Sequence, residues 1–153
     1  SNELRVKKFI ELFEMQTSAI TESKIMIKMG ASHVMKGTSF YGVKDIGNYL
    51  SEKNPGKTFH LGIFPADGFQ NMYIPFRDES SKRTQISSTF SKGIINLARR
   101  VIPGEGYVVI DVDSIRKEIS SSKTDLDPDL DKILEGFDAI LLIPQSTPNT
   151  IIE

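Results

Sequence analysis

The chain contains two histidines, and a neutral imidazole is the side chain best suited to accept a proton near pH 7. The first, His33, follows the apolar run at residues 24–29 and a small-residue turn that begins with Gly30. This pattern predicts a strand that delivers His33 to the C-terminal edge of a sheet, where open α/β sheets form their ligand crevices. We therefore expect His33 to be a catalytic base in an open, polar crevice. The alternative is a structural histidine that hydrogen-bonds a loop carbonyl.

Three further polar side chains are candidates for binding a substrate near His33. Lys36 lies in the same turn and can hold a carboxylate or phosphate, whereas a solvated surface lysine is the ordinary alternative. Asp67 follows the apolar run at residues 59–64 and can orient an imidazole or bind a hydroxyl; its alternative is a turn former in Pro-Ala-Asp-Gly. His60 lies within that run, where a histidine is more often a packing residue than a binding one.

Several kinds of chemistry are excluded by what the sequence lacks. Without cysteine the chain forms no disulfide, thiolate metal site or cysteine nucleophile, although this assigns no compartment. The two histidines lack metal-site spacing, and neither a Gly-x-Gly-x-x-Gly loop nor a Gly-x-Ser-x-Gly elbow occurs. The net charge of −1 provides no basic surface for nucleic acid, and no run approaches the ~20 apolar residues of a membrane span. We therefore expect no cofactor, no metal, no nucleic-acid partner and no membrane span.

The elements that must position these side chains alternate between helix and strand. Apolar residues at helical spacing predict helices over residues 6–20, 43–50, 94–102, 114–119 and 128–136. Apolar or β-branched runs predict strands over residues 24–29, 59–64, 107–111 and 139–143. Asp113 and Asp127 are expected to cap the last two helices. The alternation favours a three-layer α/β fold, with a mostly parallel sheet of about four strands and helices on both faces.

The length of 153 residues predicts a single α/β domain over residues 1–153. The opening Ser1-Asn2 is typical of a tag-cleavage remnant, which predicts that the chain is a piece of a longer protein. A connection as long as residues 65–90 is uncommon inside a domain unless it is a lid, a binding loop or disordered. Three aromatic residues argue against disorder, namely Phe69, Tyr73 and Phe76. We therefore expect this segment to cover the crevice.

Three pieces of the chain carry a family resemblance. They are the His33 turn Lys28-Met-Gly-Ala-Ser-His-Val-Met-Lys-Gly37, the following Val43-Lys-Asp-Ile-Gly-Asn-Tyr-Leu50, and the closing Gly136-Phe-Asp-Ala-Ile-Leu-Leu-Ile143 with Thr147-Pro148. In this order they resemble the C-terminal half of erythromycin-esterase-like proteins. The resemblance implies that His33 occupies an active-site histidine position with Lys36 beside it. The family's other catalytic histidine and its glutamate belong to an N-terminal half, and no Gly-Glu-x-His-type turn precedes Lys24.

The function we predict is therefore that of the C-terminal domain of an esterase-like hydrolase. His33 would be its general base or substrate orienter, with Lys36 and Asp67 positioning the substrate. We expect no ester turnover by this segment alone, because nucleophile activation needs an oriented second group. Its partner is a small-molecule ligand or the missing N-terminal part of the same protein. The alternative is a non-catalytic ligand-binding or protein-interaction module. A carboxylate or a second histidine that faces His33 within ~3.5 Å, directly or across one water, favours the enzyme. An isolated His33 beside an exposed apolar patch favours the binder.

Overall fold

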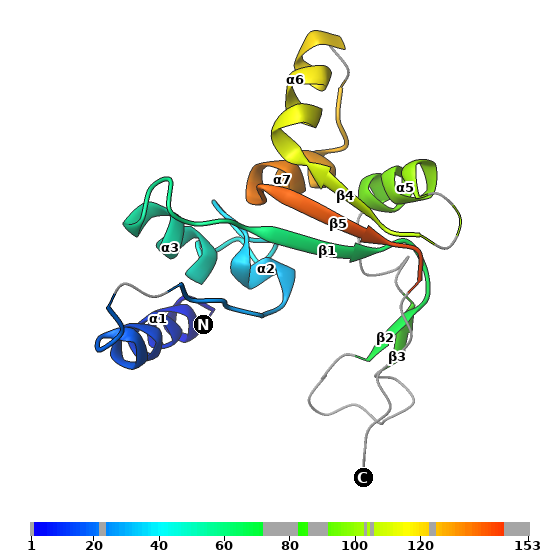
Figure 1. Ribbon diagram of the computed structural model, residues 1–153. Helices are drawn as coiled ribbons and strands as arrows, with labels where there is room; N and C mark the ends of the chain where they lie inside the picture. Colours follow the sequence, from blue (N-terminus) through cyan, green and yellow to red (C-terminus); the bar gives the residue numbers. More distant parts are fainter. Residues whose placement is uncertain are drawn as a thin grey trace. The chain divides into compact units, whose positions relative to one another are not determined.

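Six helices and two small sheets form the part of the chain that the structure, a computed structural model (Figure 1), describes: residues 2–21, 24–71, 83–85, 92–102, 104, 106–122 and 125–145. The chain divides into two units. Unit 1 holds Ser1–Gly62 and Glu135–Asp138, and unit 2 holds Ile63–Leu134 and Ala139–Glu153. The expectation of one domain over residues 1–153 stays a prediction.

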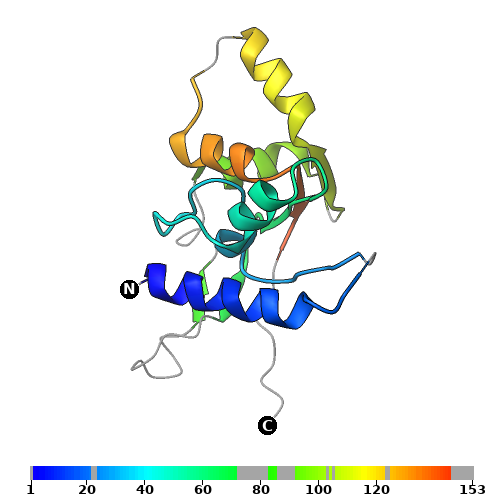
Figure 2. The ribbon, with the colours of Figure 1, turned by 90° about the vertical axis from the view of Figure 1, so that its left-hand side faces the viewer.

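Unit 1 contains the helices α1 (Asn2–Thr17), α2 (Ala31–Val34) and α3 (Ile46–Lys53). Helix α1 lies beside α3 (Figure 2). There Lys53 Nζ donates to Glu14 Oε1 at 2.6 Å, and the Tyr49 hydroxyl donates to the same oxygen. These two hydrogen bonds hold the pKa of the Glu14 carboxyl below its usual value, Lys53 contributing most. The exposed ion pair thus joins the two helices, while α1 buries Val6.

The strand predicted over residues 24–29 is wrong, because this run pairs with no strand in the described part of the chain. Met26 is 91% exposed, and about half of Ile25 is exposed. Lys24 and Lys28 are exposed as well, so the run lies on the surface and not between neighbouring strands. His33 consequently does not follow a strand.

Unit 2 contains most of a three-stranded sheet with the order β1-β5-β4, formed by β1 (Leu61–Pro65), β5 (Ala139–Ile143) and β4 (Val108–Asp111). The pair β1 and β5 is parallel. The pair β4 and β5 is antiparallel, with Val109 opposite Leu141. The predicted α/β fold class is therefore confirmed. The described sheet has three strands and mixed direction, where a mostly parallel sheet of about four strands was predicted. Two helices, α6 (Val112–Ser122) and α7 (Pro128–Gly136), separate β4 from β5. Asp111 at the end of β4 lies opposite Ala139 at the start of β5, so the chain leaves the sheet and re-enters it at the same end.

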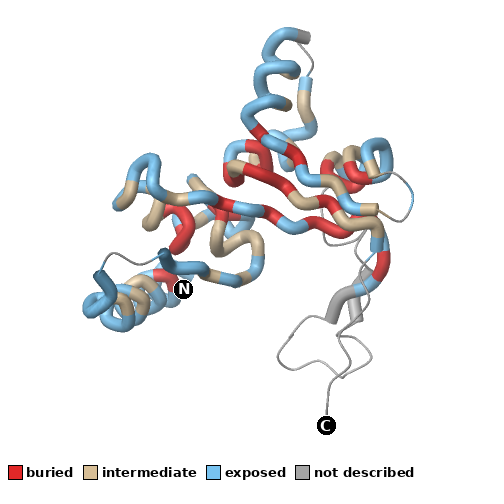
Figure 3. The backbone as a smooth tube through the Cα atoms, viewed as in Figure 1, coloured by how far each residue is buried: buried red, intermediate tan, exposed pale blue. Residues whose placement is uncertain are grey.

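The apolar core of unit 2 is supplied by the strands and by two helices, α7 and α5 (Lys92–Val101), as Figure 3 shows. Its buried side chains include Phe64, Ile94, Ile95, Ala98, Ile110, Ile133, Leu134, Ile140 and Leu142. Gly93 brings α5 close to α7, since a Cβ atom at position 93 would lie 2.8 Å from the Leu130 Cβ. Ile63 of β1 and Val109 of β4 are 50% and 61% exposed. The presence of helices on both faces of the sheet stays a prediction.

Aspartates are the N-caps of both helices that separate β4 from β5. The Asp127 Oδ1 accepts hydrogen bonds from the Asp129 and Leu130 amides, both at 3.1 Å, which confirms the predicted N-cap of α7. The N-cap of α6 is Asp111, not Asp113 as predicted. Its Oδ2 accepts from the Ser114 amide at 3.2 Å and from the Ser114 hydroxyl at 2.5 Å. The Ser114 hydroxyl is the main reason that the pKa of Asp111 lies below its usual value.

The segment predicted to cover the crevice, residues 65–90, contains an antiparallel pair of strands. These are β2 (Phe69–Asn71) and β3 (Arg83–Gln85). Tyr73 and Phe76 lie outside the described residues, so the covering role stays a prediction. Among the helices that the structure describes, none has the length and apolar character needed to cross a membrane.

Candidate functional site

His33 lies on α2, a helix of one turn, instead of at the end of a strand. The turn begins at Gly30, whose carbonyl accepts the His33 amide at 2.9 Å, and the Met35 amide donates to the Ala31 carbonyl at 3.2 Å. A helix this short does not persist by itself, because forming its first turn fixes several dihedral angles for one hydrogen bond. The orientation of His33 therefore depends on contacts with the rest of unit 1.

The main contact of the His33 ring is a carboxylate. His33 Nδ1 lies 2.7 Å from Asp45 Oδ2, and the two side chains are 26% and 2% exposed. Asp45 is the N-cap of α3, and its Oδ1 accepts the Ile46 amide at 2.7 Å. The Tyr41 ring lies 5.8 Å from the His33 ring, centroid to centroid. His33 is thus half-buried and paired, where an open crevice was expected.

The tautomer of His33 follows from this pairing. An ionised carboxylate only accepts hydrogen bonds, so Nδ1 must carry the proton that it donates to Asp45. In the neutral ring the lone pair is then on Nε2. Within the described residues Nε2 has no hydrogen-bond partner. The arrangement is that of an oriented general base, with a buried aspartate fixing the ring and one nitrogen left to accept a proton.

A second polar cluster joins Lys36, His60 and Asp138. Lys36 Nζ donates to Asp138 Oδ1 at 2.5 Å, and the His60 amide donates to Asp138 Oδ2 at 2.7 Å. Burial alone would raise the pKa of Asp138. The hydrogen bonds from Lys36 and from the His60 amide, with the charge of Lys36, outweigh burial and hold that pKa below its usual value. The Lys36 ammonium is therefore engaged by a protein carboxylate, and its binding role stays a prediction.

His60 is a buried residue with a specific hydrogen bond. It is 7% exposed, and its Nδ1 lies 2.6 Å from the carbonyl oxygen of Val34, the residue after His33. Its Nε2 is buried and has no partner among the described residues. This placement agrees with the packing alternative for His60, and the ring makes its contact on α2.

Asp67 belongs to unit 2, whereas the other predicted site residues belong to unit 1. It is exposed, and its Oδ1 accepts the Gly68 amide at 2.7 Å. Asp67 is thus a turn former, as its alternative interpretation had it. A role for Asp67 in binding a substrate stays a prediction.

The sequence reasoning missed Asp45 and Asp138. Asp45 carried a usable signal, because an aspartate directly before the apolar residues of a predicted helix is a typical N-cap. Asp138 carried none, since its partners Lys36 and His60 lie far from it in the sequence.

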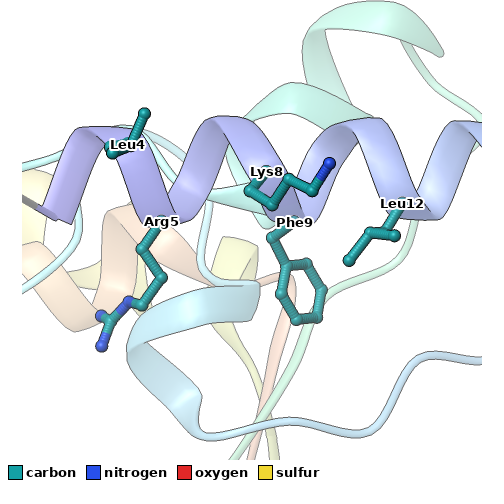
Figure 4. Close-up of a pocket in the computed structure, with 5 residues that line it drawn as sticks. All are labelled: Leu4, Arg5, Lys8, Phe9 and Leu12. Carbon is teal, nitrogen blue, oxygen red and sulfur yellow. The ribbon is translucent and has the colours of Figure 1, made fainter.

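Two surface hollows on unit 1 lie apart from the His33 and Asp45 side chains. One is formed on α1 by Leu4, Arg5, Lys8, Phe9 and Leu12 (Figure 4), and another by α1 with residues 42–44. Neither is lined by His33 or Asp45. In the described part of the chain, no three histidine or acidic side chains are grouped to hold a metal ion.

Comparison with known proteins finds no family model, no curated protein and no solved structure that matches this chain. The resemblance to erythromycin-esterase-like proteins is therefore a proposal, and its support comes from the site itself.

Proposed function

We propose that this chain is the C-terminal part of an esterase-like hydrolase in which His33 is the general base. One observation carries the proposal: the 2.7 Å contact between His33 Nδ1 and the buried Asp45 carboxylate. It is the facing carboxylate that separates a catalytic histidine from an isolated one. In the reaction, Nε2 takes a proton from the water that attacks the ester carbonyl, and Asp45 stabilises the imidazolium that forms. As the acyl C–O bond then breaks, the imidazolium returns this proton to the leaving alkoxide, which departs as the alcohol.

The proposal assigns supporting roles to other parts of the chain. Lys36 lies three residues after His33, and its side chain is 31% exposed, so it can approach a substrate carboxylate or phosphate. Asp67 and residues 65–90 position and cover the substrate. The fold of the proposed enzyme is the three-layer form, with helices on both faces of the sheet. The second histidine and the glutamate come from the N-terminal part that the family resemblance implies.

The second candidate is a non-catalytic ligand-binding module. Tyr41, which is 54% exposed, favours it, because an exposed aromatic ring beside a histidine can stack on the flat part of a small molecule. A module of this kind would bind a ligand through His33 and Tyr41 and would leave esters intact.

Hydrolysis of p-nitrophenyl acetate by the full-length gene product tests the proposal. His33→Ala and Asp45→Asn should each lower kcat/KM by about 100-fold or more, the usual contribution of a general base. Asp129→Asn, an exposed aspartate in the first turn of α7, is the matched control and should leave the rate unchanged.

The present chain alone should give no turnover, because the second histidine and the glutamate that the resemblance implies belong to an N-terminal half. Hydrolysis that survives His33→Ala would contradict the proposal. A full-length protein that hydrolyses no ester would favour the binding module.

A further inference from the structure

We infer that His60 is the positioning residue for His33, because its ring holds the one-turn helix that presents His33 to Asp45. The catalytic consequence of this inference rests on the proposed function, whereas the positioning itself does not. His60 touches no reacting atom, and it acts through the backbone of Val34.

The Val34 carbonyl needs a partner from outside α2. The last carbonyl groups of any helix lack intrahelical donors, and α2 is only four residues long. His60 Nδ1 meets this carbonyl at 2.6 Å. A carbonyl oxygen only accepts, so Nδ1 must carry the proton. Nε2, which has no partner among the described residues, then carries the lone pair. The buried His60 ring is therefore the Nδ1–H tautomer, and it donates this proton to Val34 of α2.

His60 is itself held at its backbone. Its amide donates to Asp138 Oδ2 at 2.7 Å, and its carbonyl accepts the Asp138 amide at 2.8 Å. Asp138 also holds Lys36 Nζ, and the Lys36 amide donates to the Gly136 carbonyl at 2.8 Å. Lys36, which follows α2, and His60, which holds the end of α2, are thus hydrogen-bonded to the same short segment, Glu135–Asp138.

The same Val34 peptide is packed against the helix that carries the partner of His33. Gly47 of α3 lies so close to Val34 that a Cβ at position 47 would be 2.4 Å from the Val34 oxygen. Asp45 caps α3 two residues earlier. Because His60 and Gly47 both meet the Val34 peptide, they set the distance between His33 on α2 and Asp45 on α3.

NMR of the histidine rings tests the inference without reference to catalysis. In the wild-type chain, the ¹⁵N shifts should show His60 as the Nδ1–H tautomer; the Nε2–H tautomer would overturn the inference. The low-field proton resonance of His33 Nδ1–H reports its hydrogen bond to Asp45. His60→Leu should abolish or broaden that resonance. His60→Asn should retain it, because its side-chain amide replaces the Nδ1–H donor.

Each outcome of the variant comparison decides the inference. A resonance lost in His60→Leu and kept in His60→Asn supports it. A resonance kept in both variants, or lost in both, overturns it, because the hydrogen bond to Val34 would then not be what matters. If His60→Leu does not fold, the wild-type tautomer of His60 decides, and loss of the His33 resonance in His60→Asn also overturns the inference.

Kinetics of the full-length gene product adds the catalytic consequence. His60→Leu should lower kcat about 100-fold with KM within about twofold, as expected when a catalytic group is misplaced. His60→Asn should recover most of the rate. If the wild-type product hydrolyses no ester, the proposed function fails, while the ring spectra still test the positioning role of His60.

Discussion

Replacing Gly47 with alanine should push α2 and α3 apart and destabilise unit 1. A Cβ atom at position 47 would lie 2.3 Å from the Val34 carbonyl carbon and 2.6 Å from the Met35 oxygen. These are backbone atoms, so no side-chain rotation relieves the overlap, and the helices must separate by about 1 Å to restore normal contacts. Overpacking costs about 1–3 kcal/mol, and the better helix propensity of alanine offsets up to about 1 kcal/mol of it. We expect a net loss of about 1–2 kcal/mol in the free energy of unfolding.

Urea unfolding followed by far-UV circular dichroism measures this loss. With an m-value of about 1–3 kcal/mol/M, the midpoint should fall by roughly 0.3–2 M. Gly30→Ala is the matched control, because a Cβ atom at position 30 would meet only the His33 Cδ2, at an ordinary 3.7 Å. Its midpoint should stay at the wild-type value. A Gly47→Ala chain that unfolds at the wild-type midpoint would refute the packing of α2 on α3 described above.

Three further predictions concern the carboxylates of the two units. Asp45→Ala should lower the free energy of unfolding by about 2 kcal/mol in urea titrations, because it removes the cap of α3 and the partner of His33; an unchanged midpoint would refute this. Lys36→Met should raise the pKa of Asp138 in a ¹³C carboxyl titration, because it removes the hydrogen bond and the positive charge that lower this pKa against the effect of burial. Because the pKa of Asp138 is lower in the folded chain than in the unfolded chain, the ionised carboxylate stabilises the wild type at pH values above the unfolded pKa. The difference in free energy of unfolding between the wild type and Lys36→Met should therefore shrink below about pH 4. Asp127→Ala should cost about 1 kcal/mol through the lost cap of α7, measured by the same urea titration.

Several elements could be predicted from the sequence because their signals are local. Strand β5 begins and ends where the apolar run does, at Ala139 and Ile143. Helix α7 follows Asp127, starts at Pro128 and ends at Gly136, as a cap, a first-turn proline and a terminal glycine predict. Each of these signals lies within a few residues of the feature that it specifies.

The pairing of strands and the partners in the site could not be predicted in this way. The run at residues 24–29 has strand-like composition, but only a neighbouring strand would make it one. Asp138 meets His60 and Lys36 across 78 and 102 residues of sequence, and periodicity holds no information about such distances. His33 was identified by its residue type, while the geometry that makes it a candidate base comes from Asp45, 12 residues along.

Unit 1 also sets an order of events during synthesis, because its last segment, Glu135–Asp138, is translated long after the rest. Asp138 follows His60 by 78 residues, which at about 5–20 residues per second amounts to roughly 4–16 seconds of translation. Throughout that interval the His60 backbone and the Lys36 ammonium lack their carboxylate partner, and α2 lacks the segment to which its end is fixed. A nascent chain that stops before Glu135 therefore contains His33 and Asp45 but lacks the segment that fixes them in place. His33 is therefore translated early, but it is fixed in place only after Glu135–Asp138 has been translated.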